Sequence, residues 1–195
     1  MSKEMLLKGC GAGSAALLQD AFTGADGTNL TAHAMDLGGG WTAVSGVAKL
    51  LGNRANADTA GADGKVTYQA DAGRSDVTVL ATVNLAGASN ECGLVFRYQD
   101  ASNFWALSGY AGDGKLYLYE VNGGATTQRA AGSAGVTSGV DFVLKVVLSG
   151  TGITAYKDGA QVLTYTSASF QAATRHGLRS WQVTNKWDDF QVSSP

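Results

Sequence analysis

The chain has 195 residues and a formal net charge of −2; 45% of its residues are hydrophobic and 15% are charged. This composition excludes an intrinsically disordered chain, and the length suffices for one domain with a continuous core. The basic residues form no stripe, which argues against nucleic-acid partners, and no apolar run approaches the roughly 20 residues that cross a bilayer. We therefore expect neither a nucleic-acid nor a membrane partner.

Residues 1–18 form a short N-terminal arm with two apolar clusters. The clustered residues are Met5, Leu6, Leu7, Leu17 and Leu18. Apolar residues on a terminal arm are expected to be buried, either on the arm's own domain or on a neighbouring subunit, and the sequence leaves both open. We take these residues as an assembly arm that precedes a domain over 19–195.

Charged residues interrupt the first apolar cluster. Glu4 and Lys8 leave only three consecutive apolar residues, whereas a signal peptide needs about 7–15. We therefore expect no signal peptide and synthesis in the cytoplasm. The chain has only two cysteines, Cys10 and Cys92, for which two free thiols are favoured over a disulfide.

The rest of the chain alternates with the period of β-strands. Apolar side chains occupy every second position over 77–85 and again over 140–148. The positions between them include the polar residues Thr78, Thr82, Asn84, Asp141 and Lys145. Asp158-Gly159 separates two further runs and favours a type I′ hairpin turn. No amphipathic helix of ten or more residues follows residue 20, so the sequence predicts an all-β domain.

Residues 92–121 predict three antiparallel strands with a mixed patch on one face. The turn near Asp113-Gly114 places Trp105 beside Glu120, and the simplest pairing across residues 99–103 places Arg97 opposite Trp105. The resulting Arg97–Trp105–Glu120 patch is either a sugar platform or a cross-strand ion pair with a cation–π contact. The alternate positions are then assigned to the core: Leu94, Phe96, Phe104 and Ala106.

Two other tryptophans are candidate ligand contacts. Trp41 and Trp181 lie beside turn-rich segments, where an indole can be exposed. Three aspartates, Asp20, Asp188 and Asp189, have the chemistry for a structural calcium ion, although capping of loop amides explains them equally well.

The sequence lacks the usual signatures of catalysis. Retaining glycosidases need two carboxyl groups about 5–5.5 Å apart, yet no two of Glu4, Glu91 and Glu120 are near neighbours in the sequence. The two histidines, His33 and His176, show no metal-ligand spacing. We predict a protein that is not an enzyme, with no catalytic residue, cofactor or metal.

Three segments resemble the concanavalin A-like lectin/glucanase superfamily over roughly residues 20–193. They are the opening DAF, the central GLVFRYQDASNFWALSG with GKLYLYEVNGG, and the closing GLRSWQVTNKWDDFQV. The resemblance implies an antiparallel jelly-roll β-sandwich whose first and last strands are neighbours, with Phe22 and Phe190 in the core. This fold carries lectins, hydrolases and structural domains alike, so it does not decide the function.

The opening segment over residues 20–42 also resembles one found in tailed-bacteriophage virion proteins of this fold. That resemblance implies a non-enzymatic tail, fibre or capsid-surface decoration protein located on the virion. Its partners would be other virion proteins or copies of itself in a homo-oligomer, with host cell-surface glycan as a further contact. The alternative is a free-standing bacterial carbohydrate-binding, lectin-like module.

Overall fold

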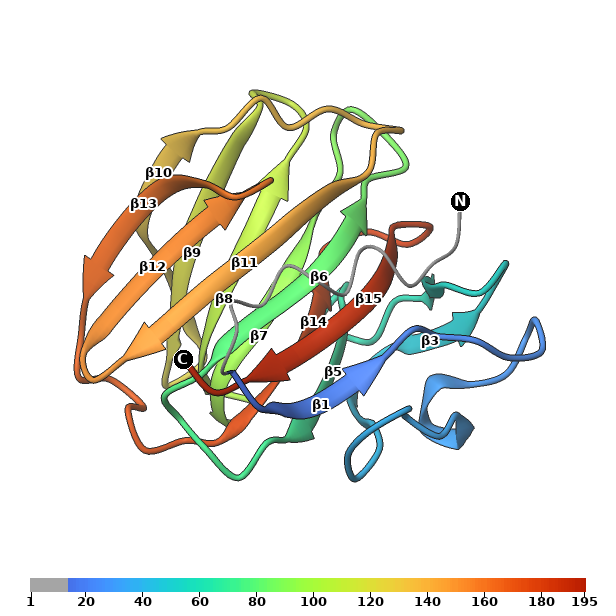
Figure 1. The fold of residues 1–195 in the computed structure, drawn as a ribbon. Coiled ribbons are helices and arrows are strands. Elements are labelled where there is room, and N and C mark those ends of the chain that lie inside the picture. The colour runs from blue at the N-terminus through green and yellow to red at the C-terminus, as the bar shows by residue number, and fades with distance from the viewer. Residues whose placement is uncertain (1–13) are drawn as a thin grey trace.

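The computed structural model describes residues 14–195 and shows two antiparallel sheets packed as a sandwich (Figure 1). The first sheet has eight strands: β1 (Ala16–Asp20), β3 (Val47–Leu50), β4 (Ala55–Thr59), β6 (Thr78–Asn84), β11 (Phe142–Ser149), β12 (Gly152–Lys157), β13 (Ala160–Thr166) and β15 (Lys186–Ser193). The second has seven: β2 (Thr42–Ser45), β5 (Val66–Asp71), β7 (Glu91–Asp100), β8 (Asn103–Tyr110), β9 (Lys115–Asn122), β10 (Ala125–Ser133) and β14 (Arg175–Ser180).

The strands follow one another in the order β13-β12-β11-β6-β15-β4-β3 in the first sheet, with β1 paired to β15. In the second sheet the order is β10-β9-β8-β7-β14-β5-β2. A short 3-10 helix, η3 (Leu30–Ala32), lies in the loop after β1. The predicted all-β jelly-roll sandwich is confirmed, and no helix among residues 14–195 is long and apolar enough to span a bilayer.

The alternating patterns correspond to central strands of the first sheet. Val79, Ala81 and Val83 of β6 are fully buried, and so are Leu144, Val146 and Leu148 of β11. The strand that corresponds to the second pattern begins two residues later than predicted, because Val140 is exposed and precedes β11. Asp158 and Gly159 have φ of 50° and 83°, as the predicted type I′ turn between β12 and β13 requires.

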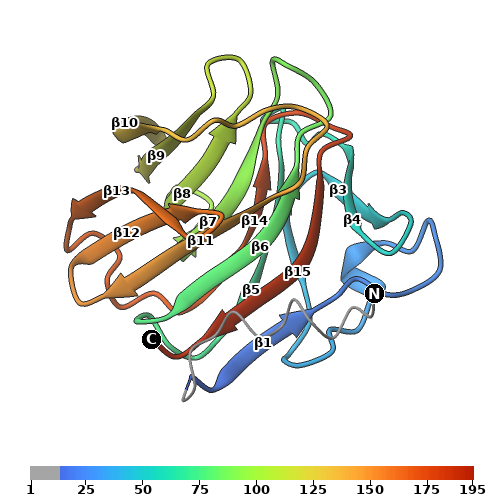
Figure 2. The ribbon, with the colours of Figure 1, turned by 45° about the horizontal axis from the view of Figure 1, so that its top comes forward.

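Strands β1 and β15 bring the two ends of the described chain side by side (Figures 1 and 2). Asp20 pairs with Phe190, and both Phe22 and Phe190 are buried in the core, as the resemblance implied. Strand β1 begins at Ala16, so the boundary placed after residue 18 is wrong.

The two leucines assigned to the second cluster of the arm are part of the sandwich. Leu18 is buried in the core and Leu17 packs against it. An amphipathic segment that pairs with β15 satisfies both its backbone and its apolar side chains within the chain. The other assembly-arm residues, Met5, Leu6 and Leu7, lie outside the described residues, as does Cys10; Cys92 is a buried free thiol.

The seven-stranded sheet carries an irregularity where the sequence suggested regular pairing. Phe96, not Arg97, lies opposite Trp105, and regular pairing of β7 with β8 stops there and resumes at Asp100 opposite Asn103. Arg97 lies within this bulge and has a φ of 46°, in the left-handed region that non-glycine residues seldom adopt.

Candidate functional site

The predicted Arg97–Trp105–Glu120 patch does not exist as a surface. Trp105 and Glu120 are cross-strand partners as expected, but the indole of Trp105 is fully buried against the other sheet and donates to the carbonyl of Ser169 (3.1 Å). Glu120 accepts from Nε of Arg129 at 2.8 Å. The face assignment was reversed for Phe104 and Ala106 of β8, because both faces of this sheet are apolar, whereas Leu94 and Phe96 of β7 lie in the core as predicted.

The side chain of Arg97 is not part of a surface patch and has a structural role. Its guanidinium is buried and donates through Nη2 to Asp76 (3.1 Å) and to the carbonyl of Gly150 (2.6 Å). These two acceptors lie in separate loops, so the side chain ties those loops to the bulge of β7. Burial lowers the pKa of Arg97, and nearby Asp76 opposes that shift.

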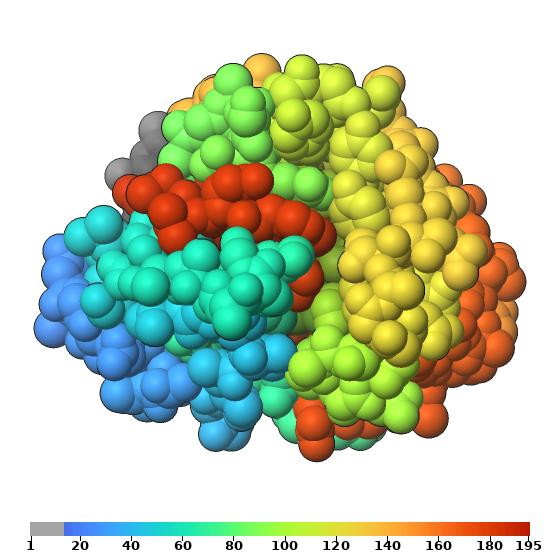
Figure 3. Space-filling model, turned by 180° about the vertical axis from the view of Figure 1, so that it is seen from behind, coloured from blue at the N-terminus to red at the C-terminus, as the bar shows by residue number. Residues whose placement is uncertain are grey.

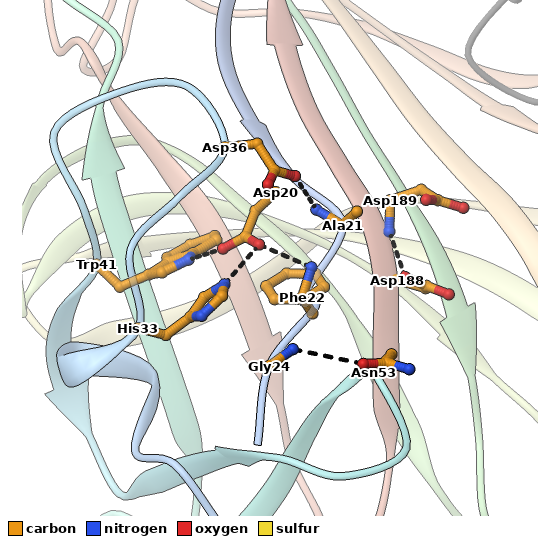
Figure 4. A network of polar contacts seen from close by, with 10 residues as sticks. All are labelled: Asp20, Ala21, Phe22, Gly24, His33, Asp36, Trp41, Asn53, Asp188 and Asp189. Atoms are coloured by element: carbon orange, nitrogen blue, oxygen red, sulfur yellow. Dashed lines mark hydrogen bonds and ion pairs between the residues drawn. The ribbon is translucent and has the colours of Figure 1, made fainter. Parts of the chain in front are cut away.

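Trp41 is also buried rather than exposed. Its Nε1 donates to Asp20 Oδ2 at 2.7 Å, and its ring packs between Phe22 and Phe190, with centroid distances of 6.0 and 4.8 Å (Figure 4). The proposed ligand contact is therefore a packing residue that holds the loop between β1 and β2 against the core.

Two of the three aspartates considered for calcium, Asp20 and Asp188, cap backbone amides. Asp20 Oδ1 accepts from the backbone of Phe22 (2.7 Å) and from Nε2 of His33 (2.9 Å), and Asp188 accepts from the backbone of Asp189 (3.0 Å). Figure 4 shows the side chains of Asp188 and Asp189 directed away from Asp20. No cluster of three or more potential metal-ligating side chains occurs within residues 14–195.

A second apolar cluster lies on the opposite side of the seven-stranded sheet from the core, which we call the outer face. It is formed by residues of β7, β8 and β9 that alternate with core residues, and Val44 and Trp181 pack against it. The buried members are Val95, Tyr98, Phe104, Ala106 and Val121. Figure 3 views the molecule from this side and shows the surface hollowed at its centre. Side chains of the outer face therefore form the floor of a hollow.

Four half-buried aromatic side chains cross this face in a continuous row. Tyr110 and Tyr117 have ring centroids 6.4 Å apart, Tyr117 and Tyr119 6.0 Å, and Tyr119 and Trp181 5.6 Å. Tyr117 and Tyr119 are two positions apart on β9 and therefore share a face, and the other two rings extend the row from β8 and from the residue after β14. We call these four residues the aromatic row.

The carboxylate of Glu91 lies against the aromatic row, where it is hydrogen-bonded to Tyr119. The hydroxyls of Ser108 and Tyr119 donate to it, and its backbone N–H donates to Gln182 Oε1 at 2.6 Å. Burial raises the pKa of Glu91, and burial together with the charge of Glu91 raises the pKa of Tyr119. The carboxylate is thus fixed in position by its donors.

Arg179 is the cation of the same face. Its guanidinium carbon lies 4.9 Å from the ring centroids of both Phe104 and Trp181, and Nη1 donates to Thr67 Oγ1 at 2.9 Å. Burial lowers the pKa of Arg179 to about 10. Aromatic rings that accept the C–H face of a pyranose, together with fixed donors and acceptors for hydroxyls, are the chemistry by which proteins hold sugars.

Of the five predicted ligand contacts, only Trp181 lies at this site. The three tyrosines, Glu91 and Arg179 were missed. The segment KLYLY, with Tyr117 and Tyr119 on alternate positions from Leu116 and Leu118, was the available signal, because such a strand must present both tyrosines on one face. No comparable local signal marked Arg179.

A further pocket of about 420 Å³ opens on the eight-stranded sheet, on the side away from the core. Leu80, Thr82, Val143, Asp36 and Asp189 are among the residues that line it. Its only aromatic residue, Phe190, is buried, so the pocket offers no exposed ring on which a sugar could stack.

No family model and no curated protein matches the sequence. Among solved structures, the β-glucanase of Bacillus licheniformis superposes with a TM-score of 0.61 at 7% identity, covering 93% of this chain and 99% of its own. The carbohydrate-binding module CBM66 of Bacillus subtilis gives 0.55 at 19% identity (79% and 91%). A Bacillus subtilis protein of unknown function with a galectin-like fold gives 0.58 at 14% identity (88% and 97%). These likenesses show that the chain has the concanavalin A-like jelly-roll fold.

Proposed function

We propose that this protein is a non-catalytic glycan-binding module whose site is the outer face of the seven-stranded sheet. The aromatic row carries this proposal, because it places four partly accessible rings in line along a hollow with a fixed carboxylate and a guanidinium beside them. One of the structural neighbours is itself a carbohydrate-binding module, which agrees with this function.

The arrangement of carboxylates favours binding over hydrolysis. Glu91 bonds to Tyr119 on the outer face, while Glu120 follows Tyr119 on the same strand and so points to the opposite face. These two glutamates cannot form the facing pair that a retaining glycosidase needs. Release of reducing sugar from a bound glycan would contradict the non-catalytic part of the proposal.

A glycan array followed by calorimetry on the best ligand tests the binding function. Trp181→Ala should weaken that binding about fivefold to thirtyfold, because stacking on one aromatic ring contributes on the order of 1–2 kcal/mol. Tyr156→Ala is the matched control: Tyr156 is a half-buried tyrosine of β12 in the other sheet, where Lys145 covers its ring at 4.2 Å. Equal losses in the two variants, or no saturable binding by the unaltered protein, would refute the site.

We further propose that the module is displayed on a bacteriophage virion, as a tail, fibre or capsid-surface component that forms a homo-oligomer. The resemblance of the segment over residues 20–42 supports this placement; a free-standing bacterial module is the alternative. Light scattering of the full chain beside a chain lacking residues 1–13 tests it. A defined oligomer that becomes a monomer on truncation supports assembly through the arm, and a monomer in both samples favours the free-standing module.

A further inference from the structure

Arg179 is a buried cation without a counter-ion. Only 5% of the residue is exposed, and no carboxylate within residues 14–195 forms an ion pair with it. Removing a charge from water is unfavourable unless hydrogen bonds or an opposite charge compensate. The compensation present here is incomplete, which makes Arg179 the most unusual polar group of the outer face.

The surroundings of the guanidinium leave one particular edge unused. Phe104 and Trp181 lie over the charged group, each 4.9 Å from it, and Nη1 is engaged by Thr67. Nε is shielded from solvent and has no hydrogen-bond partner, and no hydrogen bond from Nη2 to a residue of the described chain is present. Nε–H and Nη2–H point in the same direction, and this edge is the one that binds both oxygens of a carboxylate side by side.

The nearest carboxylates are held by other donors. Glu91 accepts from Ser108 and Tyr119, and Asp63 accepts from the Ser45 hydroxyl and, at 3.1 Å, from the backbone of Lys65. Both are close enough to interact with the charge of Arg179 through space, but neither contacts it. Arg179 therefore has negative charges nearby, but no carboxylate of the described chain accepts hydrogen bonds from its Nε and Nη2.

We propose that the outer face selects glycans whose sugar rings carry a carboxylate, which binds in bidentate fashion to the Nε–Nη2 edge of Arg179 after the side chains that shield Nε have moved aside. This inference rests on the proposed glycan-binding function and specifies its ligand class. The ring that bears the carboxylate would stack on Trp181, because Trp181 already lies against the guanidinium. Uronic acids and sialic acids both supply such a group.

Calorimetry on the full chain with two matched pairs of probes distinguishes these sources. Trigalacturonate is compared with neutral galactotriose, and 3′-sialyllactose with lactose. We expect the acidic member of one pair to bind about tenfold to a hundredfold more tightly than its neutral partner, as a charged hydrogen-bonded pair typically provides. The pair that shows the preference identifies the uronate or the sialate.

Substitutions separate the bidentate contact from general attraction by positive charge. Arg179→Gln should reduce the ratio of acidic to neutral affinity to about one, and Arg179→Lys should restore it only in part, because an ammonium cannot offer two parallel donors. Arg175→Gln removes the same charge from an exposed position on the same strand and should leave the ratio unchanged. Thermal unfolding of each variant shows whether it is folded.

A measurement on the unaltered protein makes the test independent of folding of the variants. The Nε–H resonance of Arg179 should shift on titration with the acidic sugar and remain in place with the neutral one. Equal affinity for both members of each pair, with no shift of this resonance, overturns the inference while the glycan-binding function stands. If no probe and no array glycan binds, the proposed function fails and this inference fails with it.

Discussion

The carboxylate of Asp20 offers the sharpest test of how the loop between β1 and β2 is held. It is buried and accepts hydrogen bonds from Phe22, His33 and Trp41 (Figure 4). Asp20→Ala would leave two fully buried donors, the Phe22 backbone and the Trp41 indole, without an acceptor, while His33 can turn toward water. At about 1–3 kcal/mol for each unsatisfied donor, the free energy of unfolding should fall by about 2–6 kcal/mol.

Guanidinium chloride denaturation followed by circular dichroism measures this loss. It is large compared with the roughly 5–15 kcal/mol by which domains are stable, so the midpoint should move clearly. Asp36→Ala is the matched control, because Asp36 is exposed and accepts a single bond, from the backbone of Ala21 at 2.8 Å. A loss for Asp20→Ala below about 1 kcal/mol, or no greater than that of Asp36→Ala, would refute the account.

Two further predictions concern buried groups. His176 Nε2 bonds to the Arg74 carbonyl at 2.9 Å, and burial lowers the pKa of His176 to about 4. The unfolded chain therefore binds more protons between about pH 6.5 and 4, and the free energy of unfolding should fall by about 3 kcal/mol as the pH is lowered through that range. Urea denaturation should show this slope in the unaltered protein and a smaller one in His176→Gln; equal slopes would contradict it. Trp105→Ala should destabilise the fold by about 3–5 kcal/mol while a chain that is still folded keeps its glycan affinity, and a selective loss of affinity would return Trp105 to the site.

The sequence was sufficient for those parts of the fold that are encoded locally. Alternation over 77–85 and the Asp158-Gly159 turn depend on a residue's own backbone preference and on which neighbours share its face, so they could be inferred without tertiary contacts. The neighbouring positions of the first and last strands came instead from the resemblance to a known superfamily. The structure then added that Leu17 and Leu18 belong to the first of those strands.

The composition of the candidate site depended on tertiary structure for three physical reasons. In β8, Trp105 and Phe104 are both buried, so alternation divides the strand into two sets without telling which set faces the other sheet. The bulge that contains Arg97 also shifts the pairing of β7 by an amount that no periodicity encodes. Trp181 and Tyr119 are far apart in the sequence, and their rings meet because β14 and β9 belong to the same sheet, with only β7 and β8 between them. The local pattern determined the strands, and the order and curvature of the sheets determined which side chains form the site.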